Sequence, residues 1–445
     1  MKPSAAVLSR YLARRTFPVE PHLLPERCSP RLVVVIPAMA EWPGLVNTLT
    51  DLERGMTEDL AEEVLVLVVV NHPNGAPESV QENNRQTLKA LANPKSLGLC
   101  RIRLGVIDAA SAPVIPAGEG VGTARKLGMD AAAAILNGAG SPWGGIICLD
   151  ADTRVDPDYL ERWKTCFASG RRWGMVCEVW HRPVGSRRLE DGIAAYECRL
   201  RCHELGLCLA GSPYGYPVVG SAMACSAVAY AAAGGMNRRT AGEDFYFLQA
   251  LAKTGRIEKV PNIRVYPEGR VSERVPFGTG RTMLQIMDEP DARPRAYHPE
   301  TYRLLRQVFD AAVLLETGNA EAFMVALKRE SAVLEAFFTA TAFPQVWERI
   351  SANHRQAAAR RRAFHEWFDG FRTLKLIHFL RDSGWDMISP EAAAGPLLTW
   401  AAQGYGNRIY GGTELHEPSE IGTVLEQLRR VCAVQCRGPW GLACL

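Results

Sequence analysis

Along the first third of the chain, short apolar runs alternate with segments in which apolar residues recur every three or four positions. Four of the runs have the length and composition of buried strands: 32–36, 64–70, 101–107 and 146–149. Three segments between them have the periodicity of helices: 44–52, 79–91 and 124–136. Strands that alternate with helices are typical of a parallel sheet with helices on its faces. We therefore predict an α/β fold with a mostly parallel sheet.

The pattern changes toward the C-terminus. A strand is predicted over 174–180 and a helix over 189–209, and beyond about Pro290 the periodicity is helical. The longest of these later helices are predicted over 299–316, 320–339 and 354–381. We expect three parts in the chain: an arm and linker at 1–30, an α/β domain at 31–288, and a helical region at 289–445.

Charge and composition narrow the range of functions. The 445 residues include 51 Lys and Arg against 48 Asp and Glu, a net charge of +3, which gives no case for nucleic-acid binding. The hydrophobic fraction of 47% is that of a globular protein. No run approaches the ~20 apolar residues needed to cross a bilayer, and the N-terminus lacks the apolar core of a signal peptide. We therefore predict a cytoplasmic protein without a transmembrane segment, whose twelve cysteines are reduced.

Two acidic residues, Asp150 and Asp152, directly follow the fourth predicted strand. The carboxyl ends of parallel strands converge on a crevice where ligands bind. Carboxylates two residues apart can hold Mg²⁺ or Mn²⁺ there, because these ions complete their shell with water and substrate phosphates. The alternative is that both residues only end the strand and cap the turn. The sequence thus contains a candidate metal site.

A second acidic pair, Glu243 and Asp244, follows Gly242 at the start of a helix predicted to run to Lys253. Carboxylates in a first turn interact favourably with the helix dipole, so capping is one interpretation. The other is a general base that takes a proton from the hydroxyl group of an acceptor.

Glycine-rich segments occur at two further places. Around residues 118–126 the glycines would let the backbone approach a diphosphate at a helix N-terminus, with Arg125 and Lys126 adding positive charge. The dinucleotide pattern G-x-G-x-x-G is not satisfied there. A basic segment at 270–281 either clamps a phosphate or an acidic acceptor, or is a solvated loop.

Taken together, these segments carry a family resemblance. The stretch 33–52, the helix that contains Ala124-Arg125-Lys126, the strand-end Asp-x-Asp, and the block 219–251 with its Gly-Glu-Asp occur in a characteristic order. Over about residues 31–283 the chain resembles the family 2-like glycosyltransferases of GT-A fold. That resemblance implies a GT-A-type nucleotide-diphospho-sugar transferase fold for the catalytic domain at 31–288.

The resemblance also implies roles for individual residues. Asp150 and Asp152 would bind Mg²⁺ or Mn²⁺, and Asp244, with Glu243 beside it, would be the catalytic base. The nucleotide-sugar would be bound by residues from several loops, namely Pro37, Ala38, Glu41, Asn71, Gly120, Gly122, Arg125, Arg274 and Arg281. The sequence shows no obvious third metal ligand, and Glu273 and His298 are the candidates for it. The chain departs from the family pattern at Ala40, where the family commonly has Asn, and at Asn71, where acidic residues are usual.

The resulting hypothesis is a metal-dependent, inverting glycosyltransferase that moves a sugar from a nucleotide-sugar to the hydroxyl of an unidentified acceptor. A retaining GT-A transferase or a sugar nucleotidyltransferase would use a similar site. A GT-A-shaped protein that binds nucleotide without turnover is the alternative from a different class. The region beyond 290 contains no motif that indicates a function, and a homo-oligomer is possible.

Two clusters have a plain structural explanation. Cys198, Cys202, His203 and Cys208 have the chemistry of zinc ligands, but their spacing on a helix favours ordinary thiols. Aromatic residues between His365 and Arg381 favour core packing over an acceptor-binding wall.

Overall fold

The computed structural model describes residues 5–14, 29–112, 115–272, 278–289, 291–405 and 420–435. The chain forms two compact units, each built from two segments. The first unit comprises Met1–Val184 and Pro217–Arg281, and the second comprises Gly185–Tyr216 and Thr282–Leu445. The domain boundaries expected near residues 30 and 288 remain a prediction. The two units describe which residues of the chain pack together.

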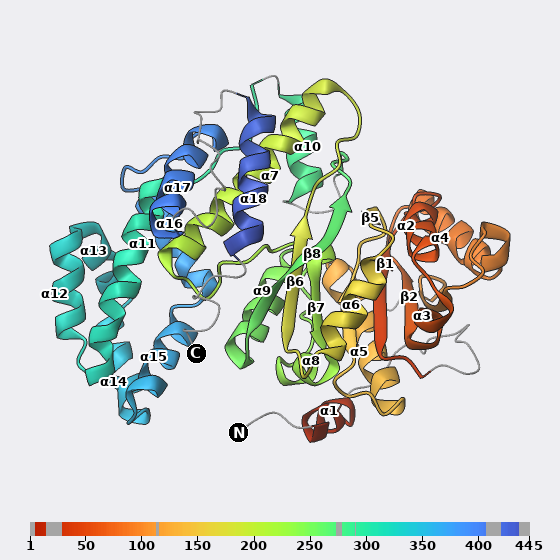
Figure 1. Ribbon diagram of the computed structural model, residues 1–445, viewed down its shortest axis with the longest axis horizontal. Coiled ribbons are helices and arrows are strands. Elements are labelled where there is room, and N and C mark those ends of the chain that lie inside the picture. The colour runs from red at the N-terminus through yellow and green to blue at the C-terminus, as the bar shows by residue number, and fades with distance from the viewer. Residues whose placement is uncertain are drawn as a thin grey trace. The chain divides into compact units, whose positions relative to one another are not determined.

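A single eight-stranded sheet in the order β3-β2-β1-β4-β7-β6-β8-β5 forms the centre of the first unit (Figure 1). Its first four strands, which pair in parallel, are β1 (Leu32–Ala38), β2 (Val64–Asn71), β3 (Arg103–Ala109) and β4 (Gly145–Cys148). Every residue of β1, β2 and β4 is buried, as expected of continuous apolar runs covered on both faces. The predicted α/β class is confirmed, and these four strands lie where the sequence predicted them.

The other half of the sheet is mixed in direction. It consists of β5 (Thr153–Val155), β6 (Gly174–Val179), β7 (Met223–Ser226) and β8 (Ile257–Pro267). Strand β7 runs antiparallel to both β4 and β6, and β5 runs antiparallel to β8. The register of β8 with β6 shifts beside Asn262, which adopts a left-handed φ of 70°. Of these strands, the sequence predicted only β6.

Helices flank the sheet of the first unit. They are α1 (Ala5–Leu12), α2 (Leu45–Arg54), α3 (Glu58–Glu63), α4 (Glu78–Leu91), α5 (Val121–Gly138), α6 (Tyr159–Ala168), α8 (Ala227–Ala232) and α9 (Glu243–Thr254). Helix α5 packs closely on β1 and β2 at Gly128, where a Cβ atom would overlap Val35 and lie 2.8 Å from Val69. The glycine therefore sets how closely this helix approaches the sheet.

A buried polar cluster attaches the N-terminal helix α1 to α5. The hydroxyl groups of Tyr11 and Tyr230 both donate to Asp130, at 2.6 Å. The ammonium group of Lys126 lies 2.9 Å from the second oxygen of the same carboxylate. Lys126 is thus paired within this cluster, away from the phosphate role that its position in the sequence suggested.

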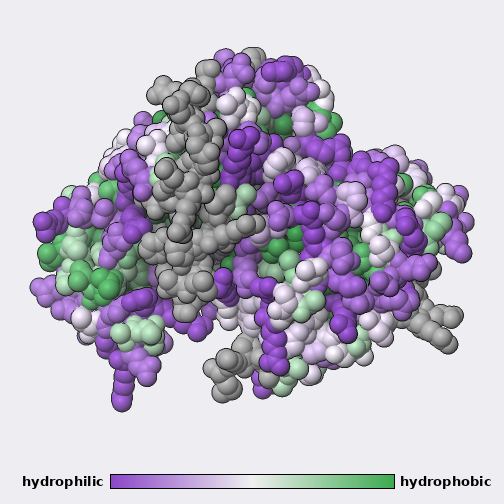
Figure 2. All heavy atoms as spheres, viewed as in Figure 1, coloured by the Kyte–Doolittle hydropathy of each residue, from purple (hydrophilic) through white to green (hydrophobic). Residues whose placement is uncertain are grey.

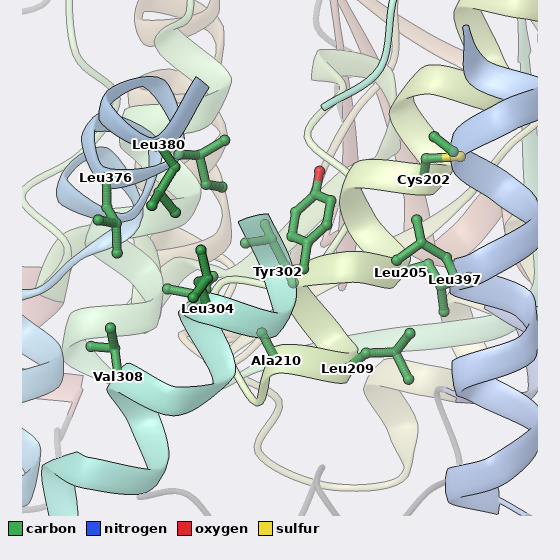
Figure 3. Close-up of a cluster of buried hydrophobic side chains, with 14 of the residues drawn as sticks. Cys202, Leu205, Leu209, Ala210, Tyr302, Leu304, Val308, Leu376, Leu380 and Leu397 are labelled. Atoms are coloured by element: carbon green, nitrogen blue, oxygen red, sulfur yellow. The ribbon is translucent and has the colours of Figure 1, made fainter. Parts of the chain in front are cut away.

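The second unit is helical. After α7 (Arg187–Ala210) and the boundary helix α10 (Thr279–Asp288), it contains α11 (Pro299–Ala311), α12 (Glu321–Glu330), α13 (Ala332–Ala340), α14 (Phe343–Asn353), α15 (Ala357–Trp367), α16 (Gly370–Arg381), α17 (Pro390–Tyr405) and α18 (Ile421–Gln435). Helix α7 packs against α11, α17 and α18, and its Leu205 and Leu209 lie with Tyr302 in the core that Figure 3 shows. The predicted helical region is confirmed, although two predicted helices are broken, at Ser331 and near Asp369.

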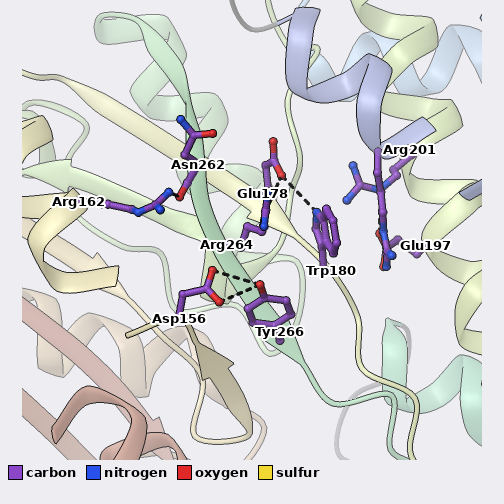
Figure 4. A network of polar contacts seen from close by, with 10 residues as sticks. Asp156, Arg162, Glu178, Trp180, Glu197, Arg201, Asn262, Arg264 and Tyr266 are labelled. Atoms are coloured by element: carbon purple, nitrogen blue, oxygen red, sulfur yellow. Dashed lines mark hydrogen bonds and ion pairs between the residues drawn. The ribbon is translucent and has the colours of Figure 1, made fainter. Parts of the chain in front are cut away.

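Buried charge also joins α7 to α18. Glu197 accepts hydrogen bonds from Arg201 on its own helix at 2.8 Å and from Arg429 at 2.9 Å. Glu197 and Arg201 are labelled in Figure 4, which also shows the hydrogen bonds from Tyr266 to Asp156 in the first unit. Glu197 thus joins the two helices through charge-assisted hydrogen bonds to an arginine on each of them.

The cysteine and aromatic clusters noted in the sequence lie in the second unit. Cys198 and Cys202 are buried as free thiols, and the described residues include no group of three or more His, Cys, Asp or Glu side chains that could hold a metal ion. Phe368 lies in the core, as predicted. Trp367 and the 39% exposed Phe371 line a separate cavity of about 380 Å³.

Hydrophilic side chains dominate the face shown in Figure 2, and hydrophobic ones form small separate patches there. Within the described parts of the chain, no helix combines the length and the hydrophobicity that crossing a membrane requires.

Candidate active site

A cavity of about 510 Å³ opens at the carboxyl ends of β1, β2 and β4 in the first unit. Residues from different parts of the chain line it: Pro37, Met39 and Glu41 at and after the end of β1, Asn71 and Pro73 at and after the end of β2, residues 118–121 at the start of α5, residues 150–152 after β4, and Pro267, Glu268, Arg270 and Ser272 at and after the end of β8. The first, second and fourth of these follow parallel strands, so their convergence is the outcome that an open parallel sheet imposes.

Seven of the predicted site residues line the cavity: Pro37, Glu41, Asn71, Gly120, Arg125, Asp150 and Asp152. Five other described residues of the predicted set do not line it, namely Ala38, Gly122, Glu243, Asp244 and Arg281. Ala38 is buried at the end of β1, Gly122 packs against the backbone of Arg239, and Arg281 is exposed on α10. Arg274 and Glu273 lie outside the described residues.

The guanidinium group of Arg125 connects the two acidic motifs. Its Nη2 lies 2.5 Å from Asp150 Oδ1, and its Nε lies 3.0 Å from Glu243 Oε1. Burial alone would lower the pKa of Arg125, but the two carboxylates outweigh it and the pKa is raised. Gly220 leaves room for this side chain, because a Cβ there would overlap the guanidinium group. Arg125 is thus a permanent buried charge with 4% of its side chain exposed.

A second arginine lies across the cavity wall. Nη2 of Arg270, just after β8, is 2.6 Å from Glu41 Oε1 and 2.9 Å from Asp152 Oδ2. Burial raises the pKa of Asp152 to about 7, since the opposing effect of Arg270 is offset by Asp150 and Glu41. The acidic side chains that line the cavity outnumber these two arginines, and their excess favours the binding of a further cation.

Asp244 lies in the first turn of α9, beside the Arg125 cluster. Gly242 precedes the helix with a left-handed φ of 71°, which turns the chain so that Glu243 reaches Arg125. The Oδ1 atom of Asp244 accepts a hydrogen bond from the Phe245 amide at 2.7 Å. Burial, then the charge of Glu243, raises the pKa of Asp244 to about 7. A carboxyl group with such a pKa accepts a proton effectively near neutral pH.

Two asparagines that sequence reasoning missed hold the first loop of the site. On α4, Asn84 accepts a hydrogen bond from the Ala40 amide at 2.9 Å and donates one to the carbonyl oxygen of Asn71 at 2.9 Å. Its neighbour Asn83 bonds both the amide and the carbonyl of Trp42. Ala40 has a left-handed φ of 54°, a conformation in which Asn is enriched. The departure from the family pattern at Ala40 thus coincides with side-chain support from another helix.

Asn71 is itself committed to the backbone. Its side-chain amide donates to the carbonyl oxygens of Ala38 and Val69, at 3.2 and 3.0 Å. It therefore ties the end of β2 to the end of β1 at the floor of the cavity.

The donor set at the cavity suits a hard divalent cation. Asp150 and Asp152 supply carboxylate oxygens from one loop, and such ligands match Mg²⁺ and Mn²⁺. The third ligand expected from the sequence is not found among the described residues: His298 caps α11 in the second unit, where its ring accepts from the Glu300 amide. A cation held by the two aspartates would therefore keep positions for water and phosphate oxygens.

Comparison with known proteins agrees with the resemblance. Residues 145–295, about a third of the chain, match the model for glycosyl transferase family group 2. This segment includes Asp150, Asp152, Asp244 and Arg270. Among curated proteins, none matches the sequence.

Solved structures that match this chain include two distant ones. One is S. aureus TarS 1–349 in complex with UDP-GlcNAc, with 12% identity, a TM-score of 0.40, and coverage of 79% of this chain and 92% of that one. Another is the mannosyltransferase PcManGT from Pyrobaculum calidifontis in complex with GDP-Man and Mn²⁺, with 17% identity, a TM-score of 0.34, and coverage of 82% and 94%.

The family match and the sheet define the class of this protein: it is a glycosyltransferase, with the α/β architecture predicted for a GT-A enzyme. The resemblance stated from the sequence is therefore confirmed, as is the enzyme class.

Proposed function

We propose that this enzyme transfers a sugar from a nucleotide-sugar to an acceptor hydroxyl group, with a divalent cation at Asp150 and Asp152. The observation that supports the proposal is the linkage from Glu243 through Arg125 to Asp150 beside the cavity. It brings the start of α9, where the candidate base lies, to the loop that would hold the donor's diphosphate.

Each part of the cavity has a task in this reaction. The backbone around Gly118 and Gly120, at the N-terminus of α5, faces the space that the phosphates would occupy. A Mg²⁺ or Mn²⁺ ion on the two aspartates would neutralise negative charge on the leaving nucleoside diphosphate. Arg125 holds the Asp150 carboxylate in position for that ligation, because the guanidinium group is itself fixed by burial.

Asp244 is the proposed general base. The acceptor oxygen attacks the anomeric carbon, the bond between that carbon and the diphosphate oxygen breaks, and the hydroxyl proton moves to the Asp244 carboxylate. The nucleoside diphosphate leaves with the bonding electron pair. Attack from the face opposite the leaving group inverts the anomeric configuration, so the product anomer distinguishes this mechanism from retention.

Ligand-dependent thermal unfolding tests the proposal. The wild-type protein and Asp152→Asn are melted with UDP, GDP, ADP and CDP and with their sugar derivatives, with and without Mn²⁺. A ligand at about 100 times its Kd should add about 2.7 kcal/mol to the free energy of unfolding. We expect a metal-dependent shift for one nucleotide that Asp152→Asn loses. Absence of a shift with every nucleotide would refute the proposal.

A further inference from the structure

A cationic side chain already lies between the acidic groups of the candidate metal site. One nitrogen of Arg270, Nη2, contacts both Glu41, at 2.6 Å, and Asp152, at 2.9 Å. Glu41 comes from the loop after β1 and Asp152 from the loop after β4, so a single positive charge joins two loops of the cavity. Any divalent cation that binds Asp152 must share or replace that contact.

The two arginines of the site differ in how easily a ligand can take over their contacts with the aspartates. Arg125 belongs to a helix, has 4% of its side chain exposed, and pairs with Asp150 and Glu243 at once. Arg270 follows the last residue of β8 by three positions, and 31% of its side chain is exposed. The Arg125 contact is therefore a fixed part of the structure, whereas that between Arg270 and Asp152 faces the cavity and can be exchanged.

We propose that Arg270 is the resident counter-ion of Asp152, that it opposes binding of the divalent cation alone, and that it transfers its Asp152 contact to the donor's diphosphate when metal and nucleotide bind together. This inference rests on the proposed function. A guanidinium group has five N–H donors, so Arg270 retains Glu41 while another of its nitrogens contacts a phosphate oxygen. The exchange leaves every charge paired, and this avoids the cost of an unpaired buried carboxylate.

The consequence is coupling between metal and nucleotide. In the protein without nucleotide, the cation competes with a positive charge that is already in place. When nucleotide is bound, its phosphates accept hydrogen bonds from Arg270, and Asp152 becomes available to the cation. Metal affinity therefore rises when nucleotide binds and, by reciprocity, nucleotide affinity rises with metal. Removing Arg270 should strengthen the binding of metal alone and weaken the binding of nucleotide, two effects of opposite sign.

Mn²⁺ titration followed by the EPR signal of the free ion tests this inference. The proteins are wild type, Arg270→Gln, Arg270→Lys and Arg172→Gln, each without nucleotide and with saturating UDP or GDP. We expect Arg270→Gln to bind Mn²⁺ alone about tenfold more tightly, equivalent to about 1.4 kcal/mol. Arg270→Lys keeps the charge but has one nitrogen, so its increase should be smaller, about threefold.

Arg172 is the matched control. Its side chain is also 31% exposed and lies 2.6 Å from a carboxylate, that of Glu258, outside the residues that line the cavity. Arg172→Gln should leave Mn²⁺ affinity unchanged. Asp152→Asn in the Arg270→Gln background should abolish the gain, which places the ion at this site.

Each result decides a separate point. Unchanged or weaker Mn²⁺ binding by both Arg270 variants overturns the inference, as does a gain that survives Asp152→Asn. A gain with Mn²⁺ alone, combined with no thermal shift from any of the nucleotides tested under the proposed function, supports the counter-ion role of Arg270 but refutes the proposed function. If Arg270→Gln fails to fold, the Arg270→Lys series decides.

Discussion

Replacing Arg125 by methionine removes the charge that joins the two acidic motifs and keeps most of the side-chain volume. The guanidinium group pairs with Glu243, whose side chain is 5% exposed, and with Asp150, whose side chain is 30% exposed. Breaking a buried ion pair by removing one partner typically costs 3–5 kcal/mol, because it leaves an uncompensated charge. We therefore expect Arg125→Met to lower the free energy of unfolding by about 3–5 kcal/mol at pH 8.

The two partners should contribute unequally. Water can solvate Asp150 after the change but hardly reaches Glu243. Adding Glu243→Gln to Arg125→Met should therefore recover about 2 kcal/mol or more, whereas adding Asp150→Asn should recover about 1 kcal/mol or less. Double-mutant cycles measured by urea unfolding, followed by circular dichroism, give both coupling energies.

Arg172→Met is the reference for an exposed pair of similar geometry, and it should cost no more than about 1 kcal/mol. The reasoning fails if Arg125→Met also costs less than about 1 kcal/mol. It fails equally if the Asp150 cycle shows coupling as large as the Glu243 cycle, because burial would then not govern the energy.

Four further predictions concern the base, the sheet and the N-terminal helix. Asp244 can accept a proton only when it is ionised, and its pKa is raised to about 7. The value of kcat/KM should therefore increase as pH rises through about 7. Asp244→Asn should lower kcat/KM by about a hundredfold or more and should remove this pH dependence. The same raised pKa favours folding below about pH 4 and disfavours it as pH rises through 7, so stability measured from pH 4 to 8 should fall more in wild type than in Asp244→Asn. Gly128→Ala overlaps Val35 and should cost about 1–3 kcal/mol by calorimetry; an unchanged Tm would contradict the close packing of α5. Tyr11→Phe removes one of the hydrogen bonds to Asp130 and should lower the free energy of unfolding by about 1 kcal/mol in urea unfolding; a value equal to that of the wild type would contradict this contribution.

The parallel half of the sheet was predictable because β1, β2 and β4 are formed by apolar runs, and β3 contains a shorter buried run between Arg103 and Asp108. The antiparallel half was not. Strand β7 is only Met-Ala-Cys-Ser, too short and too small to be distinguished from the alanine-rich residues around it. Strand β8 contains Pro261 and the left-handed Asn262, both of which normally argue against a strand. Its pairing with β6 tolerates them through a shift of register.

The sequence indicates candidate site residues one by one but not the network of contacts that joins them. Loops at strand ends and a family pattern indicated Asp150, Asp152 and Asp244. No local pattern links Arg125 to Glu243, because 118 positions separate them. The basic segment at 270–281 was singled out, yet Arg274 and Arg281 were preferred in it. Arg270 is distinguished only by its contact with Glu41, 229 positions earlier, a separation that no spacing rule covers.

The discontinuous build of the two units has a consequence for synthesis on the ribosome. Helix α7 ends at Ala210, but α18, which covers part of its buried face, ends at Gln435. At translation rates of about 5–20 residues per second, roughly 10–45 s pass before that partner has been made. During this time the part of α7 that α18 covers in the folded protein has no cover, while the first unit can complete its sheet once β8 has emerged. The nascent chain therefore carries a finished sheet together with a helix whose apolar face is only partly covered, and this interval is when chaperone binding or aggregation should be greatest.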